Sequence, residues 1–190
     1  MPHSDTIIFQ PLNIAVLTVS DTRTMETDDS GQLLQDRLET GGHVLSARKI
    51  VIDDVYRIRA VVSDWIADPM IHAVLVTGGT GFTPRDSTPE ALAPLFDKQI
   101  EGFGELFRHL SYDQIGTSTI QSRALGGLAN NTLIFAMPGS PKACGLAWDQ
   151  ILGEQLDRRQ KPCNFVGLLR PQEPATCSSR STSHPQPVKS

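Results

Sequence analysis

The sequence predicts an α/β fold with three layers, α/β/α, in which helices cover both faces of a mostly parallel sheet. Short continuous apolar segments alternate with amphipathic helical patterns between residues 13 and 77, a succession typical of β-α-β units with right-handed crossovers. The chain has 190 residues, of which 39% are apolar and 20% are charged. That length supports one well-buried domain and is short for two.

Composition divides the chain into three parts. We expect residues 1–11 to form an N-terminal arm, residues 12–169 to form the domain, and residues 170–190, rich in Pro, Ser and Thr, to be a disordered tail. The first residues lack a basic segment followed by an apolar one, and no apolar stretch approaches the ~20 residues that span a bilayer. We therefore expect a cytoplasmic protein that does not enter a membrane.

Charge and cysteine usage exclude several classes of partner. The net charge of −4 arises from 17 basic and 21 acidic residues spread along the chain, so no basic field is present for nucleic acid. The three cysteines and five histidines lack the spacing of a disulfide framework or a zinc site. Any anionic ligand must therefore be held by local groups.

The first part of the domain is predicted to contain two helices and three strands. Ser30 is the expected cap of a helix that runs to about Glu39. Asp53 or Asp54 is the expected cap of a second helix, whose apolar residues recur at steps of three and four until Pro69. The strands are expected at residues 13–19, 43–52 and 72–77.

The second part is predicted to contain a short helix, a pair of strands and a long helix. Ser87 or Thr88 would cap the short helix. In the segment "SRALGGLANNTLIFAMPGS" two strands would be joined at Asn130-Asn131, residue types that tolerate a left-handed turn. Ser140 would then cap a helix over residues 141–159.

Acidic side chains follow each of the three expected strands in the first part of the chain. The loops at 20–29, 53–54 and 78–87 leave the carboxyl ends of these strands, where ligands bind in parallel sheets. We therefore expect the acidic groups of these loops to meet at one cleft, namely Asp21, Asp53, Asp54 and Asp86.

The loop "TGGTGFTPRDSTPE" has the composition of a phosphate-binding backbone. Gly78, Gly79 and Gly81 allow positive φ angles and leave N–H groups free to point at a guest, and the alternative is a tight structural turn. The segment matches neither G-x-x-x-x-G-K-[ST] nor G-x-G-x-x-G, and the chain has no G-x-S-x-G elbow. Phosphate and metal chemistry are therefore favoured over a nucleophilic serine.

Two carboxylates are candidate ligands for Mg²⁺, which needs only one or two protein oxygens when it binds substrate phosphates. They are Asp86 and Asp53; the alternatives are an ion pair with Arg85 or a turn cap for Asp86, and a helix cap for Asp53. "MPGSP" offers a second anion site beside Lys142, or an ordinary strand-to-helix turn. Because the carboxylates would repel a phosphate bound nearby, a metal ion would have to lie between the two.

Several motifs in this order resemble the MoaB/MogA family of molybdenum cofactor biosynthesis proteins. They are "VSDTR", "DDSGQLL", "TGGTGFTPRDSTPEA", "EGFGELFR", "STIQSRALGG" and "FAMPGSPKAC", and they cover about residues 12 to 169. The resemblance implies the molybdopterin-binding domain fold and a trimer or a dimer of trimers, with other molybdenum cofactor enzymes as candidate partners. Related enzymes that insert molybdate, and competence-damage-inducible proteins, carry further domains for which 190 residues leave no room.

The resemblance also implies an activity and a set of site residues. Active members are molybdopterin adenylyltransferases, which use ATP and Mg²⁺ to join AMP to the terminal phosphate of molybdopterin and release pyrophosphate. The alternative is a molybdopterin carrier or oligomeric scaffold without catalysis. The family's two essential carboxylates fall on Asp86 and Asp53, which would also hold the metal. The positions that would contact pterin and phosphates are Ser20, Asp21, Thr77, Gly78, Gly79, Thr80, Gly81, Pro138, Gly139, Ser140 and Pro141.

Overall fold

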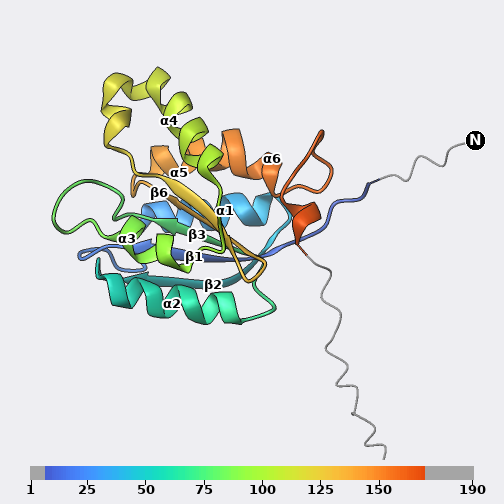
Figure 1. Ribbon diagram of the computed structural model, residues 1–190, viewed down its shortest axis with the longest axis horizontal. Coiled ribbons are helices and arrows are strands. Elements are labelled where there is room, and N and C mark those ends of the chain that lie inside the picture. The colour runs from blue at the N-terminus through green and yellow to red at the C-terminus, as the bar shows by residue number, and fades with distance from the viewer. Residues whose placement is uncertain (1–6, 170–190) are drawn as a thin grey trace, which may run out of the picture.

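The computed structural model describes residues 7–169 and contains one central six-stranded sheet between two layers of helices (Figure 1). The strands are β1 (Asn13–Val19), β2 (Val44–Val51), β3 (Ala73–Thr77), β4 (Lys98–Gln99), β5 (Leu125–Ala129) and β6 (Thr132–Met137). The helices are α1 (Asp29–Thr40), α2 (Val55–Ala67), α3 (Thr88–Leu92), α4 (Glu101–Ile115), α5 (Pro141–Ala147) and α6 (Gly153–Gln155). The expected three-layer α/β/α fold is confirmed.

The sheet is mostly parallel, as predicted. Its strand order is β2-β1-β3-β6-β5-β4, in which β2, β1, β3 and β6 run parallel and the last two pairs run antiparallel. The turn between β5 and β6 holds Asn130 at φ 46° and Asn131 at φ 66°. Both residues occupy the left-handed region that such a two-residue hairpin requires, so the predicted hairpin is confirmed.

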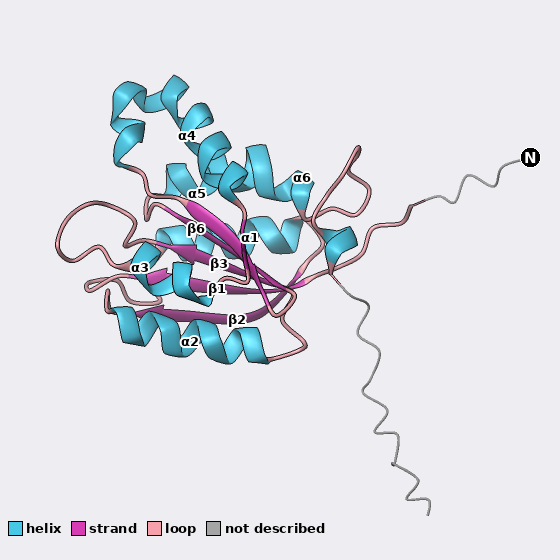
Figure 2. Ribbon diagram, viewed as in Figure 1, coloured by secondary structure: helices cyan, strands magenta, loops and turns pink. Residues whose placement is uncertain are grey.

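The central strands β1, β3 and β6 are buried on both faces, which explains why they read as continuous apolar segments. On β1, Ile14 and Val16 face one core with α1, α4 and α5, whereas Ala15 and Leu17 face a second core with α2 and α3. Figure 2 shows the sheet edge-on between these two helical layers. The alternation of side chains along each strand thus supplies one apolar surface to each layer.

The structure corrects one predicted helix start and decides between the two alternatives predicted for another. Asp28, not Ser30, caps α1, because its carboxylate accepts a hydrogen bond from the Gly31 N–H while Ser30 lies inside the first turn. Asp54 caps α2 by accepting from Tyr56 and Arg57 N–H groups, which leaves Asp53 for other contacts. Three polar residues in a row could each have served as the first cap, so the sequence alone did not separate them.

The long helix expected over residues 141–159 is shorter and interrupted. Ser140 caps α5 as predicted, and a π-helical turn over Trp148–Leu152 (η3) then separates α5 from α6, which ends at Gln155. Helix α4, which was not predicted from the sequence, carries Phe103 and Phe107 into the first core.

The termini are described only in part. Residues 7–11 contain no helix or strand, and the ring of Phe9 lies 5.2 Å from that of His43. The predicted tail at 170–190 lies outside the described residues. None of the helices in residues 7–169 has the length and apolarity needed to cross a bilayer.

Candidate functional site

Four loops leave the same edge of the sheet, because the strands that precede them are parallel. They follow β1, β2, β3 and β6, and they comprise residues 20–28, 52–54, 78–87 and 138–140. Figure 1 shows the loops after β1 and β3 projecting from this edge at the left of the view. The residues predicted for the site lie on these loops, at the end of β3 or, for Pro141, at the first position of α5, so the structure brings the predicted set to one edge of the sheet.

Asp21 links the first three of these loops. Its Oδ1 accepts a hydrogen bond from the Asp53 N–H at 3.0 Å, and its Oδ2 lies 2.6 Å from Nη2 of Arg85. The hydrogen bond from Arg85, followed by that from the Asp53 amide, holds the pKa of Asp21 below its ordinary value. Arg85 therefore pairs with Asp21, and the predicted alternative of an Arg85–Asp86 ion pair is not formed.

The Asp53 carboxylate binds the loop at residues 78–87, here called the glycine loop, and does not cap helix α2. Its Oδ1 accepts from Ser87 N–H at 3.0 Å and from Ser87 Oγ at 2.5 Å. Within residues 7–169 no donor forms a hydrogen bond to its second oxygen, Oδ2. A Cβ atom at Gly79 would lie 2.5 Å from that oxygen, which shows how closely the carboxylate packs on the loop backbone.

Asp86 packs on the same loop from its other end. Its Oδ2 accepts from Thr83 N–H at 2.8 Å and from Thr83 Oγ1 at 2.6 Å, and a Cβ at Gly81 would lie 2.8 Å away. Burial tends to raise the pKa of Asp86, but the Thr83 donors, the Gly81 amide and the charge of Arg123 together lower it. Asp86 is thus ionised and caps a turn, which was one of the predicted alternatives.

The glycine loop and the turn after β6 lie against each other. Gly78 and Gly79 have φ angles of 100° and 63°, the left-handed region that favours glycine. The Gly78 N–H donates to Met137 O at 3.0 Å, and a Cβ at Gly139 would lie 3.1 Å from Gly78 Cα. Glycine at these positions therefore leaves room for neighbouring protein atoms. This role is separate from the predicted one, in which the glycines let a ligand approach the backbone.

Thr77 and Cys144 support these loops from inside the domain. Thr77 Oγ1 donates to Pro138 O at 3.2 Å and lies 3.1 Å from Cys144 Sγ, and both side chains are buried. Burial raises the pKa of the Cys144 thiol to about 11. Thr80 is also buried. Among the predicted contact residues, Thr77 and Thr80 thus face the interior.

The predicted serines shape the loops on which they lie. Ser20 Oγ accepts from the N–H groups of Thr22 and Arg23 at 3.3 and 3.2 Å. Ser140 Oγ accepts from the Ala143 N–H at 3.2 Å. The neighbouring Gly139 and Pro141 are exposed and Pro138 is half-buried, so this turn lies at the surface of the edge.

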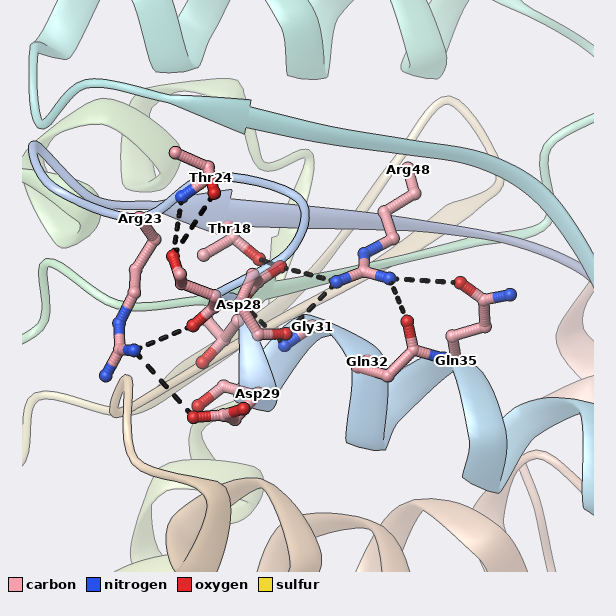
Figure 3. Close-up of polar contacts among 12 residues, drawn as sticks. Thr18, Arg23, Thr24, Asp28, Asp29, Gly31, Gln32, Gln35 and Arg48 are labelled. Carbon is pink, nitrogen blue, oxygen red and sulfur yellow. Dashed lines mark hydrogen bonds and ion pairs between the residues drawn. The ribbon is translucent and has the colours of Figure 1, made fainter.

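A buried ion pair that the sequence analysis did not predict anchors the loop after β1 (Figure 3). Arg48 Nη2 lies 2.9 Å from Asp28 Oδ2, with side chains 7% and 1% exposed. Thr18 Oγ1 also donates to Asp28 Oδ2 at 2.8 Å, and Arg48 Nη1 donates to Oε1 atoms of Gln32 and Gln35 at 2.6 and 3.2 Å. The pair fixes where the loop that carries Asp21 returns to helix α1.

Arg123 and Ser87 also contact the site without having been predicted to do so. Ser87 was expected only as a helix cap, yet its hydroxyl makes no capping bond and binds Asp53 instead. Arg123 lies between the 3₁₀ helix Gly116–Gln121 (η2) and β5, and it donates to Gly81 O. The only signal for Arg123 in the sequence is its place in the motif "STIQSRALGG".

Two hollows lie on the surface, one away from this edge and one that reaches Pro141. One of about 310 Å³ is bordered by α4 and β5, and another of about 560 Å³ lies between α1, α4 and α5. Neither is lined by Asp53 or Asp86. Residues 7–169 also contain no group of three acidic, His or Cys side chains arranged around a metal position. A cation at the edge would therefore need ligands from a substrate as well.

Comparison with known proteins identifies the family. Residues 15–158 match the family model described as "Probable molybdopterin binding domain". Over 162 residues the chain is 57% identical to molybdenum cofactor biosynthesis protein B of Escherichia coli (strain K12), covering 85% of this chain and 95% of that protein. The chain belongs to the MoaB family. The resemblance found in the sequence is confirmed.

Solved structures place the MoaB fold in a wider group. A crystal structure of molybdenum cofactor biosynthesis protein B is 44% identical, with a TM-score of 0.76, over 77% of this chain and 92% of that one. The tungsten cofactor synthesizing protein MoaB from Pyrococcus furiosus is 34% identical, with a TM-score of 0.68, over 76% and 92%. A MogA structure is 28% identical, with a TM-score of 0.68, over 76% and 97%. The same architecture thus serves both branches.

Proposed function

We propose that this protein acts in molybdenum cofactor biosynthesis by binding molybdopterin and adenylylating its terminal phosphate with ATP and Mg²⁺. The observation that carries the proposal is the placement of Asp53 and Asp86. They follow different strands, yet each packs on a glycine of one loop, Gly79 or Gly81, at the carboxyl edge of a parallel sheet. Membership of the MoaB family supports molybdopterin as the ligand.

The donor set of these carboxylates suits Mg²⁺. Asp53 keeps Oδ2 without a hydrogen bond from residues 7–169, and Asp86 engages Thr83 through Oδ2 alone. Mg²⁺ binds hard oxygen ligands and takes its remaining ones from water and phosphates. When bound, the cation would screen the negative charge of the reacting phosphates.

The chain's own groups would orient the reactants. A phosphate monoester is already an anionic nucleophile, so the reaction needs alignment and charge screening more than a strong base. The exposed turn at Gly139–Ser140 lies against Gly78, which brings two segments of loop backbone to one place. Arg85, 65% exposed, supplies a positive charge beside Asp21. These groups would hold phosphates near Asp53 and Asp86.

The test is adenylyl transfer by the purified protein supplied with molybdopterin, ATP and Mg²⁺. Asp86→Asn and Asp53→Asn should each lower the rate by roughly 100-fold or more, since each removes a charge from the metal site. Asp54→Asn is the matched control: it changes the neighbouring carboxylate, which caps α2, and asparagine still caps. Its rate should stay close to that of the wild type.

The other outcomes have definite meanings. An inactive Asp54→Asn variant with an active Asp53→Asn variant would show that the catalytic position is 54. Normal rates in Asp86→Asn would overturn the metal-site proposal. A wild-type protein that binds molybdopterin but consumes no ATP would instead be a carrier or scaffold.

A further inference from the structure

The side chain of Arg123 contacts the glycine loop at several points. Its Nε donates to Gly81 O at 2.8 Å and its Nη2 donates to Asp86 O at 3.1 Å. Its Nη1 forms an ion pair with Glu90 of α3, and its Cζ lies 5.0 Å from the ring centre of Phe82. One guanidinium group therefore touches both ends of the segment 81–86 and a ring within it.

The planar shape of the group explains how it can make these contacts at once. Nε, Nη1 and Nη2 of Arg123 each face a different acceptor, and its Cζ lies over the ring of Phe82. The side chain is only 23% exposed, so water competes weakly for its donors. A lysine could supply the charge, but it could not span two carbonyl groups and a carboxylate with a fixed fork.

The backbone of Arg123 joins the same loop. Its N–H donates to Thr80 O at 3.2 Å, one residue before the segment that its side chain holds. Within that segment the Thr83 N–H donates to Asp86 Oδ2, and the Asp86 N–H donates to Thr83 O at 3.0 Å. The orientation of the Asp86 carboxylate thus depends on a turn whose two ends are held by Arg123.

We propose that Arg123 is a positioning residue that holds the Gly81–Asp86 segment, so that the Asp86 carboxylate points where the metal and phosphates would bind. The inference rests on the proposed function, in which Asp86 is a ligand of the metal. It goes beyond that function because it places control of Asp86 on a residue from a different part of the chain. Arg123 itself need not touch the reactants.

The variants Arg123→Lys and Arg123→Gln test the inference, with Arg59→Gln as the matched control. Arg59 is also a partly buried arginine that binds two carbonyl groups, Ala91 O at 3.1 Å and Glu90 O at 2.8 Å, but these lie in α3 outside the loop. Both sites should lose similar stability on substitution, as judged by the melting temperature. Only the Arg123 variants should alter the loop.

One measurement does not depend on activity. Hydrogen exchange of the Thr83 and Asp86 amides should quicken about tenfold in Arg123→Gln and Arg123→Lys, because the turn opens more often. Unchanged exchange in Arg123→Gln would overturn the inference.

Turnover then separates this inference from the proposed function. If the wild type forms adenylylated molybdopterin, both Arg123 variants should be at least tenfold slower and should need more Mg²⁺ for half-maximal rate, while Arg59→Gln should match the wild type. Full activity in Arg123→Lys would overturn the inference and leave the proposed function intact. An inactive wild type would overturn the proposed function, and hydrogen exchange would still decide whether Arg123 holds the segment that carries Asp86.

Discussion

Two aspartate–arginine pairs near the sheet edge differ in their surroundings more than in their distances. Asp28 and Arg48 approach to 2.9 Å, with side chains 1% and 7% exposed. Asp21 and Arg85 approach to 2.6 Å, with side chains 39% and 65% exposed. Water and salt weaken an exposed pair, whereas breaking a buried pair leaves a charge without solvent. The longer contact is therefore the one on which the fold depends.

The hydrogen bonds around the two pairs support the same distinction. Asp28 receives further bonds from Thr18 and the Gly31 N–H, so nearly all of its accepting capacity is used inside the domain. Asp21 accepts only from Arg85 and the Asp53 N–H among residues 7–169, and both charged groups remain open to solvent. The buried pair fixes a loop, while the exposed pair leaves Arg85 accessible to solvent.

The largest expected effect follows removal of the buried carboxylate. Asp28→Ala leaves Arg48 buried without its counter-charge and removes the cap of α1, so the free energy of unfolding should fall by about 3–5 kcal/mol. Urea denaturation measures this. Asp29→Ala is the control, because Asp29 is the next residue along the chain and its side chain is 72% exposed. A loss below about 1 kcal/mol in Asp28→Ala would contradict the importance given to burial.

A smaller effect is expected from pH, through the buried His43 and the half-buried His72, which have no counter-charge of this kind. The Nδ1 atoms of His43 and His72 accept the N–H groups of Leu12 and Asn13, and burial lowers both pKa values from 6.5. Asp157 opposes this at His43 without reversing it. As the pH falls, these histidines therefore take up protons at a higher pH in the unfolded chain than in the folded protein. The free energy of unfolding should thus decrease below about pH 6.5.

Unfolding free energies at pH 7.5 and 5.5 check this histidine prediction. The double variant His43→Gln/His72→Gln should show a smaller difference between the two pH values than the wild type. Equal differences would assign the loss to other groups.

The smallest effect on stability is expected at the exposed pair. Asp21→Ala should leave the urea midpoint within error of the wild type, because solvent already screens the contact with Arg85. The same denaturation experiment measures it beside Asp28→Ala. A loss comparable with that of Asp28→Ala would show that the two pairs do not differ as proposed.

Much of the fold could be predicted because its signals are local. Continuous apolar strands, the helical spacing that ends before Pro69, and Asn130–Asn131 each indicate their structure within a few residues. Helix α4 gave no such signal, since its first turn contains Gly102 and Gly104 and its N-cap, Ile100, makes no side-chain capping bond. The π-helical turn after α5 likewise leaves no local pattern of its own.

The site could be predicted as a set of loops but not as a set of contacts. Parallel strands must deliver their following loops to one edge, so the meeting of Asp21, Asp53 and the glycine loop was foreseeable. The choice of partners depends on side-chain directions that spacing does not give. Arg48 reads as a surface charge within a strand, yet it is buried, and Arg123 lies far along the chain from the loop that it holds.

The close packing of Asp53 and Asp86 on Gly79 and Gly81 has a consequence for variation at these positions. A side chain at residue 79 would collide with the Asp53 carboxylate, and one at residue 81 would collide with that of Asp86. Gly81 and Asp86 can therefore vary only as a couple, because the Asp86 carboxylate is what a Cβ at residue 81 would meet; Gly79 stays constrained even without Asp53, by Thr88 Oγ1 at 2.4 Å from its Cβ position and by its φ of 63°. Paired loss of Gly81 with Asp86 would mark relatives in which this edge has been put to another use.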